Sequence, residues 1–517
     1  MTTPRKIFAL RHALFGAGAL FTSVVFAQPA STPAAEQTSP APAADFAKSL
    51  ALRTDRIVAD STRTSFGWLT QTSAATYSSK GALRLKVALA PWEGDAKPVK
   101  ELGTFSIFGG DLAASPFPFS ADLRGVSDGY YRIVAEVVDG ETSLAKLDKP
   151  LVLVAGLETK HADVAARLAK ISGHDSAKAS VLYPFDLARV INLRKRVYGS
   201  GNTNPEFGLS QAGAQQLYDF SAGLKSSAEL LTALEANKDP LPRAGGDRVR
   251  HYYMAEADEI LPYRVYVPKT WDGKSALPLV FVLHGNTRDH NFYHDRDGGI
   301  IPKTAEKHGF MLVAPLGYAP NAGYNYVPFD RERGPRGVAA ALASPQQFGP
   351  APAAQAAPAA GRGRGGAQAA GGVNGSTIPA LVRSEWSEQD AMHVFDIIKK
   401  EYPIDPKRTF LFGYSAGGQG GHYIAQKYSG NWAAVAIGGS NAAAGAHYAF
   451  DRLKDTPIMV FSGSQDGVLN ATRIMGQTLK EKGVNATFKE IAGATHDTAP
   501  SMAIADVFEF FAANARK

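Results

Sequence analysis

Ser415 lies in a setting typical of a catalytic nucleophile. Residues 413–417 read GYSAG, and the apolar segment 408–412 comes directly before them. A serine between two glycines at a sharp strand-to-helix turn is lifted above its sheet, because a flanking side chain would collide with neighbouring backbone. A plain glycine-rich turn is the alternative. The further glycines after the motif favour a nucleophile that attacks a carbonyl carbon.

A serine hydroxyl is a weak nucleophile at neutral pH and needs an imidazole to accept its proton. His496 lies just beyond the last apolar segment of the chain, in residues 493–497, which read GATHD. His422 and His447 compete with it. His422 falls on the helix expected after the nucleophile, and His447 falls in a loop after the next strand. We therefore predict that His496 is the base.

The base in turn needs an acid that fixes its tautomer. Asp466 follows the apolar segment 458–461, which is the second predicted strand after that of the nucleophile. A fold with its nucleophile on such a turn usually carries the acid in the loop after that strand. Asp455 precedes that strand and so lies at its wrong end, and Asp497 adjoins His496 too closely to reach around to its ring. Asp466 is the predicted acid, which places the three groups in the chain order Ser, Asp, His.

Two backbone amides should stabilise the oxyanion of a tetrahedral intermediate. One is predicted at Ala416, directly after the nucleophile. The other belongs to the loop that starts LHGNT at 283–287, where we predict Asn286 and leave Gly285 or Thr287 open. His284 is interpreted as a structural residue that braces this loop.

A metal centre is the alternative chemistry for three other residues. His290, His294 and Asp295 fall close together, and histidines at i and i+4 on a helix could bind zinc. A further ligand at a recognisable spacing is absent from the sequence. We interpret this segment as a polar loop and expect neither a metal nor a cofactor.

The positions of these residues require a mostly parallel sheet covered by helices. Short apolar segments alternate with helix-length stretches after about residue 252, which is the pattern of an α/β fold. One helix is predicted from Ala391, Val394, Phe395 and Ile398, and Ser387 to Asp390 resembles a capping box at its start. The predicted strands are 279–283, 311–314, 409–412, 433–437, 458–461 and 487–491.

The remaining chain divides by composition and periodicity. Alternating apolar residues, as at Leu83, Leu85 and Val87, predict a small all-β, immunoglobulin-like sandwich of antiparallel strands, and helical spacing follows it. The predicted divisions are a signal peptide at 1–27, a Pro/Ala-rich disordered spacer at 28–44, the sandwich at 45–157, a helical connector at 158–245 and the α/β-hydrolase catalytic domain at 246–517.

The amino-terminal residues predict export. Basic residues precede a short apolar run that ends in Val25, Phe26 and Ala27, with cleavage expected near Ala27. The run is too short to favour a membrane anchor, so we expect a secreted or periplasmic protein. The net charge of +7 falls to +4 without the leader and indicates no nucleic-acid partner. The chain has no cysteine, which excludes disulfides and thiol catalysis.

Residues 332–376 form a predicted low-complexity insertion rich in Ala, Gly and Pro, with the run GRGRGG at 361–366. An RNA-binding Arg/Gly segment is one interpretation. A solvated loop is favoured, because an exported protein does not meet nucleic acid. Such an insertion could form a mobile rim of the active site.

The HG loop, GYSAGG, GSQDG and GATH together resemble the exported polyhydroxybutyrate depolymerase and feruloyl esterase group of α/β-hydrolases, and also the predicted peptidases close to it. The resemblance covers roughly half of the chain, residues 252–517. It implies hydrolysis of carboxylic esters without a cofactor, through Ser415, Asp466 and His496. The absence of cysteines and the long insertion depart from many members of that group and leave specificity for a polymer in doubt.

The first functional prediction is therefore a secreted serine esterase. Its substrate would be a small-molecule or polymer-borne ester with a feruloyl, acetyl or short-chain acyl group, or a polyester oligomer. A serine peptidase with the same triad is the alternative, since both reactions share a tetrahedral intermediate. A non-catalytic protein whose sandwich binds a glycan is the second alternative.

Overall fold

The computed structural model describes residues 42–79, 81–94, 97–194, 203–204, 209–210, 218–241, 243–286, 288–319, 323–325, 380–440 and 449–516. The predicted signal peptide, most of the spacer, the insertion at 332–376, Thr287 and His447 lie outside these residues. No helix within the described ranges is long and apolar enough to cross a membrane.

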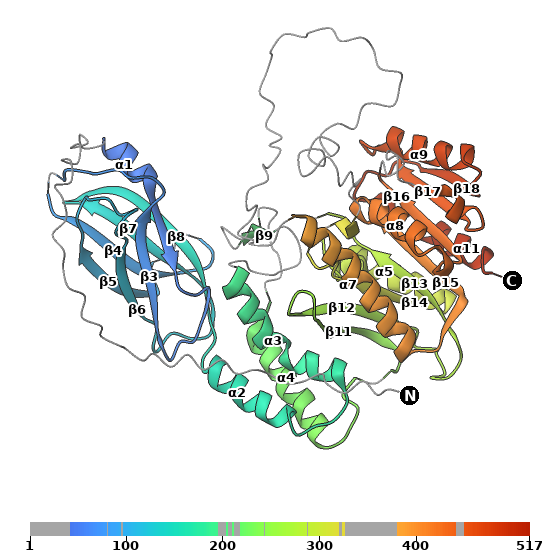
Figure 1. The fold of residues 1–517 in the computed structure, drawn as a ribbon, viewed down its shortest axis with the longest axis horizontal. Coiled ribbons are helices and arrows are strands. Elements are labelled where there is room, and N and C mark those ends of the chain that lie inside the picture. The colour runs from blue at the N-terminus through green and yellow to red at the C-terminus, as the bar shows by residue number, and fades with distance from the viewer. Residues whose placement is uncertain are drawn as a thin grey trace, which may run out of the picture.

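The amino-terminal region is a two-layer β structure, coloured blue to cyan in Figure 1. Helix α1 (Ala43–Ser49) precedes a sheet of order β1-β3-β6 and a sheet of order β2-β8-β7-β4-β5. The strands are β1 (Leu50–Thr54), β2 (Val58–Ala59), β3 (Thr64–Gln71), β4 (Leu83–Pro91), β5 (Lys100–Ser106), β6 (Phe117–Asp122), β7 (Gly129–Asp139) and β8 (Thr142–Leu153).

Both sheets contribute to one apolar core, which contains Leu69 and Phe119 from the first and Leu85, Val87 and Ile133 from the second. The predicted alternation is thus confirmed for β4. One pair differs from the antiparallel prediction, because β2 runs parallel to β8. Two residues of β2 are too few for a periodic pattern to reveal their direction.

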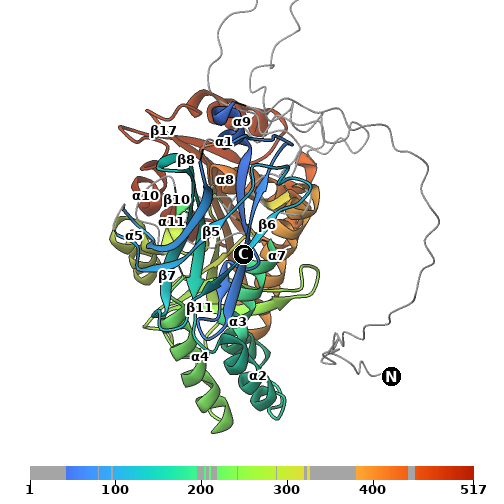
Figure 2. The same cartoon turned by 90° about the vertical axis from the view of Figure 1, so that its left-hand side faces the viewer.

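Three helices follow: α2 (Leu157–Leu168), α3 (Asp175–Arg194) and α4 (Phe220–Glu235), with a small pair formed by β9 (Thr203–Asn204) and β10 (Leu209–Ser210). Asn192 of α3 accepts hydrogen bonds from the amides of Ile57 and Val58 at 2.8 Å. On the other side, Ser176 of α3 donates to the carbonyl of His251 at 3.1 Å. Helix α3 therefore contacts both the β region and the larger sheet. Figure 1 shows the helices between these two parts, and Figure 2 views the molecule from the side of the β region.

The carboxy-terminal part is built on an eight-stranded sheet of order β11-β12-β14-β13-β15-β16-β17-β18. Its neighbours pair in parallel except where β12 meets β11 and β14, so β12 alone is reversed. This strand order is α/β-hydrolase-like and confirms the predicted fold class. The strands are β11 (Gly246–Met254), β12 (Glu259–Val267), β13 (Leu277–Leu283), β14 (Met311–Pro315), β15 (Ile404–Tyr414), β16 (Ala434–Gly438), β17 (Ile458–Gly463) and β18 (Ala486–Ile491).

Helices cover both faces of the sheet because its strands are apolar on both sides. In β13, Leu279 and Phe281 face one core and Val280 and Val282 face the other. The first core is closed by α7 (Ala380–Glu401), α8 (Ala416–Lys427) and α9 (Leu469–Glu481), and the second by α5 (Phe292–His308), α10 (Ala499–Met502) and α11 (Ile504–Ala513). Short helical turns lie at η1 (Gly323–Asn325), η3 (Ser429–Asn431) and η4 (Phe450–Leu453).

The predicted periodicity of α7 is confirmed, since Ala391, Val394, Phe395 and Ile398 are all buried in the first core. The predicted capping box is wrong. Helix α7 begins at Ala380, so Ser387 and Asp390 lie inside it. Both side chains are buried and accept hydrogen bonds from a distant loop. Residues needed for this tertiary contact thus match the local pattern of a capping box.

Truncation of Leu411 tests how far stability depends on this sheet. Leu411 is fully buried in β15, so Leu411→Ala should lower the free energy of unfolding by about 2–5 kcal/mol through lost transfer energy and the cavity left behind. Chemical denaturation measures the effect. Ile474→Ala, at a side chain 45% exposed on α9, is the control and should cost less than about 0.5 kcal/mol. Equal losses in the two variants would contradict the interpretation.

Candidate active site

Ser415 occupies the sharp turn between β15 and α8, with φ 59° and ψ −124°. A residue other than glycine pays a steric cost in this region and keeps the conformation only where the surroundings impose it. A Cβ atom on Gly413 would lie 2.1 Å from the carbonyl oxygen of Gly417, and one on Gly417 would lie 2.1 Å from that of Leu283. Both glycines are therefore required by backbone contacts that cannot move aside.

Hydrogen bonds hold the turn in place. The amide of Ser415 donates to the carbonyl of Gly438 at 3.0 Å, and the Ser415 carbonyl accepts from Gly418 and Gln419 at 2.9 and 3.0 Å. These bonds join the strained residue to the neighbouring strand β16 and to the first turn of α8. The half-buried serine is thus presented at the carboxyl edge of the sheet.

Asp466 and His496 meet at the same edge, from the loops after β17 and β18. The ring Nδ1 of His496 lies 2.9 Å from Oδ2 of Asp466. The acid side chain is 1% exposed and the imidazole 41% exposed. An aspartate behind a histidine whose other edge is open to solvent can orient the ring and stabilise its protonated form.

The carboxylate of Asp466 is surrounded by donors. Tyr414 donates its hydroxyl to Oδ2 at 2.6 Å, Ser462 donates to the same oxygen at 3.3 Å, and the amide of Val468 donates to Oδ1 at 3.0 Å. Burial alone would raise the pKa of Asp466. The bonds from Tyr414 and Val468 and the charge of His496 lower it below its ordinary value, so the acid stays ionised at neutral pH.

Within the described residues, no hydrogen bond joins Ser415 Oγ to the His496 ring. The ring instead lies 5.2 Å, centroid to centroid, from that of Tyr414, the residue before Ser415. Hydrogen bonds between a nucleophile and its base are often long without substrate and shorten in the reactive complex. The structure therefore joins the predicted acid and base directly and brings them beside the predicted nucleophile.

The loop after β13 lies against the turn that carries Ser415. A Cβ atom on Gly285 would be 3.3 Å from Ser415 Cβ and 3.8 Å from its Oγ. Asn286 follows it and is exposed, and Ala416 is the first residue of α8, where backbone amides lack partners within the helix. Amides from both predicted segments thus border the serine, and the choice among Gly285, Asn286 and Thr287 stays open.

A buried network braces that loop and extends beyond His284, the residue of it that the sequence predicted. The ring of His284 contacts the carbonyls of Gly285 and Leu316 at 2.8 and 2.7 Å. The hydroxyl oxygen of Tyr324 accepts a hydrogen bond from the His284 amide at 3.1 Å. Ser387 of α7 accepts from the amide of Tyr324 at 3.0 Å. No local sequence motif indicates that Tyr324 supports this loop, because its support depends on contacts with residues far away in the chain.

The competing residues lie elsewhere. His422 is fully buried on α8, where burial lowers its pKa to about 4. Asp455 is exposed before β17. The Asp497 side chain is 77% exposed and lies 3.9 Å from Arg288. His447 falls outside the described residues.

Two of the three residues considered for a metal lie beside other charged side chains. His294 lies 3.3 Å from Asp247, and Asp295 pairs with Arg264 at 2.8 Å. His290 is buried, which lowers its pKa to about 4. Across the described ranges, no group of three or more His, Cys, Asp or Glu side chains could hold a metal ion.

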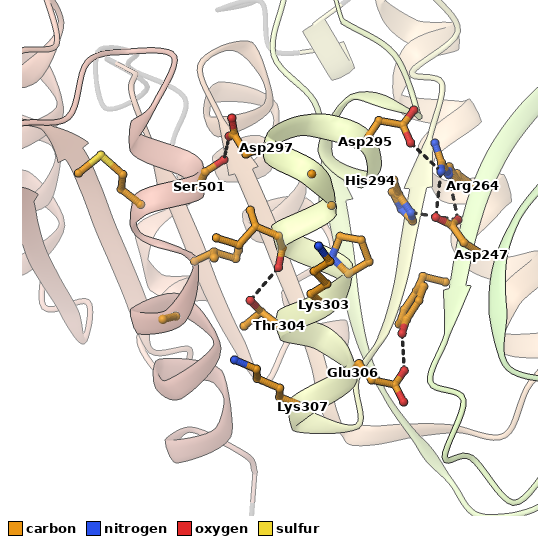
Figure 3. Close-up of a pocket in the computed structure, with 18 of the residues that line it drawn as sticks. Asp247, Arg264, His294, Asp295, Asp297, Lys303, Thr304, Glu306, Lys307 and Ser501 are labelled. Atoms are coloured by element: carbon orange, nitrogen blue, oxygen red, sulfur yellow. Dashed lines mark hydrogen bonds and ion pairs between the residues drawn. The ribbon is translucent and has the colours of Figure 1, made fainter.

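A surface groove of about 1440 Å³ lies between the edge of the sheet, α5 and the carboxy-terminal helices (Figure 3). Asp247 and Asp295 flank Arg264 on one side, and Asp297 points to Ser501 on the other. Ser415, Asp466 and His496 do not line it. The groove is thus separate from the candidate catalytic residues, although Thr498 on its wall is close to His496 in sequence.

No family model and no curated protein matches the chain. Solved structures do. FphF, a fluorophosphonate-binding serine hydrolase of Staphylococcus aureus, is 12% identical over 52% of this chain and 98% of its own, with a TM-score of 0.35. An S-formylglutathione hydrolase from Agrobacterium tumefaciens is 14% identical over 53% and 97%, with a TM-score of 0.36.

The ferulic acid esterase Fae1A from Anaeromyces mucronatus is 15% identical over 52% of this chain and 90% of its own, with a TM-score of 0.34. The α/β-hydrolase-like architecture described above rests on the strand order and the turn at Ser415. The finer resemblance to polyhydroxybutyrate depolymerases stays a prediction.

A methyl group at Gly417 tests the close approach between α8 and β13. Gly417→Ala should destabilise the protein by at least about 1–3 kcal/mol, because the added carbon meets the carbonyls of Leu283 and His284 at 2.1 and 2.7 Å. The free energy of unfolding from chemical denaturation measures the loss. In Gly430→Ala the added carbon meets nothing within 4 Å, and an equal loss there would refute the explanation.

Proposed function

We propose that the chain is a serine carboxylic-ester hydrolase in which Ser415 is the nucleophile, His496 the base and Asp466 the acid. The observation that carries the proposal is the meeting of three features at one sheet edge. These are a serine held at φ 59° by backbone packing, a carboxylate–imidazole contact of 2.9 Å, and backbone of the loop after β13 and of the start of α8 beside the serine.

In the proposed reaction, Ser415 Oγ attacks the ester carbonyl while His496 accepts its proton. The oxyanion is stabilised by the amide of Ala416 and an amide of the 285–287 loop, with Asn286 preferred. As the intermediate collapses, His496 gives the proton to the departing alcohol and an acyl-Ser415 remains. Water then attacks the acyl group with His496 as base, and release of the acid restores the enzyme.

The protein's own electrostatics support this cycle. Asp466 is ionised at neutral pH and touches Nδ1 of the imidazole, so a proton on His496 is stabilised when the serine loses it. The ring's 41% exposure leaves an edge open to substrate and water. No step requires a cofactor or a metal.

The sequence motifs are the basis for proposing which acyl group the substrate carries. Their resemblance to the feruloyl esterase and polyhydroxybutyrate depolymerase group supports feruloyl, acetyl or short-chain acyl esters and polyester oligomers as candidate substrates. Export to the periplasm or medium is part of the same proposal and is supported by the leader-like residues 1–27. Such a location would bring the enzyme to polymer-borne esters outside the cell.

Replacement of the nucleophile tests the proposal. We expect Ser415→Ala to lower turnover of p-nitrophenyl acetate, p-nitrophenyl butyrate and methyl ferulate by about 10³-fold or more, because the acyl-enzyme cannot form. The assay compares initial rates for variants of equal folded content. Ser226→Ala, at an exposed serine of α4, is the control and should retain full activity.

The same preparations should be treated with a fluorophosphonate, followed by mass spectrometry of the labelled peptide. Label on Ser415 of the wild type and none on Ser415→Ala is the expected result. Undiminished ester turnover by Ser415→Ala would show that the nucleophile is another residue. Hydrolysis of peptides but not of any ester by the wild type would favour the peptidase alternative.

A further inference from the structure

Tyr414 stands directly before the proposed nucleophile, yet its side chain turns towards the proposed acid. The ring is buried at the end of β15, with 1% of its surface exposed. Its hydroxyl donates to Oδ2 of Asp466 at 2.6 Å, and the same oxygen lies 2.9 Å from Nδ1 of His496. One carboxylate oxygen is therefore shared between the tyrosine and the imidazole.

The position of this ring is imposed by the surrounding backbone. A Cβ atom on Gly439 would lie 2.2 Å from a ring carbon of Tyr414, and one on Gly438 would lie 2.9 Å from another. The Phe461 ring packs beside it, with centroids 5.2 Å apart. Two glycines at the carboxyl end of β16 thus leave a slot that accepts a flat ring and directs its hydroxyl at Asp466.

The other groups that face the carboxylate cannot replace this contact. Ser462 reaches the shared oxygen only at 3.3 Å, and Val468 donates to Oδ1 instead. The charged groups nearby are His496 itself and, beyond it, Asp497 with Arg288. Burial and the contact with Asp466 raise the pKa of Tyr414 well above its ordinary value, so the phenol remains a neutral donor at working pH.

We propose that Tyr414 is a positioning residue for the hydrolytic reaction. Its hydroxyl fixes the rotation of the Asp466 carboxylate and takes part of the charge on Oδ2, so that His496 is aligned before attack. This inference rests on the proposed function of Ser415, Asp466 and His496. The buried Tyr414 side chain bonds to the acid, so in this proposal it acts through the pair and not on the ester.

Removal of the Tyr414 hydroxyl should shift the pH dependence of the reaction in one direction. In Tyr414→Phe the ring still fits its slot, but Oδ2 loses its shortest donor. The pKa of Asp466 then rises, since a hydrogen bond to its ionised form is lost. Because this carboxylate contacts His496, we expect the acidic limb of the kcat/KM profile to move to higher pH, by about half a unit to one unit.

In the same variant, kcat should fall while KM changes little. The transition state, in which His496 is charged, depends on the alignment of the acid, whereas the bound ester does not contact Tyr414. We therefore expect kcat for p-nitrophenyl butyrate at pH 7 to fall about tenfold and KM to stay within about twofold.

The experiment compares pH–rate profiles and kcat and KM for wild type, Tyr414→Phe and Tyr77→Phe. Tyr77 is the matched control, because its hydroxyl donates to Asp139 at 2.9 Å in the β sandwich, far along the chain from the site. Its variant should share the wild-type profile. Phosphonylation of Ser415 measured across the same pH range provides a second readout that does not depend on the acyl group.

Two failures can be told apart. A wild type that neither hydrolyses esters nor reacts with the fluorophosphonate would overturn the proposed function, and the role of Tyr414 with it. An active wild type whose acidic limb is unchanged in Tyr414→Phe, or a variant that loses affinity instead of kcat, would overturn the role of Tyr414 alone. A shift to higher pH with KM preserved supports it.

Discussion

The close approach of backbone to backbone at the start of α8 is the constraint on which the site depends. Within its first six residues this helix carries Gly417, Gly418, Gly420 and Gly421, although glycine lowers helix stability by about 1 kcal/mol per residue relative to alanine. A Cβ atom at Gly418 would lie 2.4 Å from the carbonyl of Gly438, just as one at Gly417 would meet that of Leu283. The helix therefore sits directly on the ends of β13 and β16, and Ser415 is forced into its strained conformation between them.

A second layer of support comes from buried polar groups of α7. Asp390 is fully buried, which raises its pKa to about 6, and it accepts hydrogen bonds from the Tyr252 hydroxyl and the Tyr318 amide, both at 2.7 Å. Together with the bond from the Tyr324 amide to Ser387, these contacts hold the segment after β14. That segment in turn carries the carbonyl that His284 touches. Order in the loop after β13 thus depends on residues about a hundred positions away.

The helices between the β region and the large sheet contact both of these parts. His251 of β11 lies 3.0 Å from Ser180, and its ring centroid is 4.0 Å from that of Tyr183, so α3 covers the outer edge strands of the large sheet. An exposed sheet edge offers unpaired backbone groups to other chains, and a covering helix limits this. Tyr130 of β7 reaches the carbonyl of Tyr218 at 2.6 Å, just before α4, which joins the β region to the same helices.

The amino-acid sequence alone led to the candidate nucleophile, acid and base, and it predicted the parallel sheet that the structure confirms. Those signals are local: glycine spacing around Ser415, apolar runs, and loops that must follow strands. The order of the strands, the reversed β12 and the contact between Tyr414 and Asp466 could not be obtained that way, since each joins residues far apart in the chain. Ser387 to Asp390 shows the limit most clearly. This pattern is typical of a helix start but lies inside α7. Ser387 and Asp390 accept hydrogen bonds from backbone amides of a distant loop and not from amides at the start of their own helix.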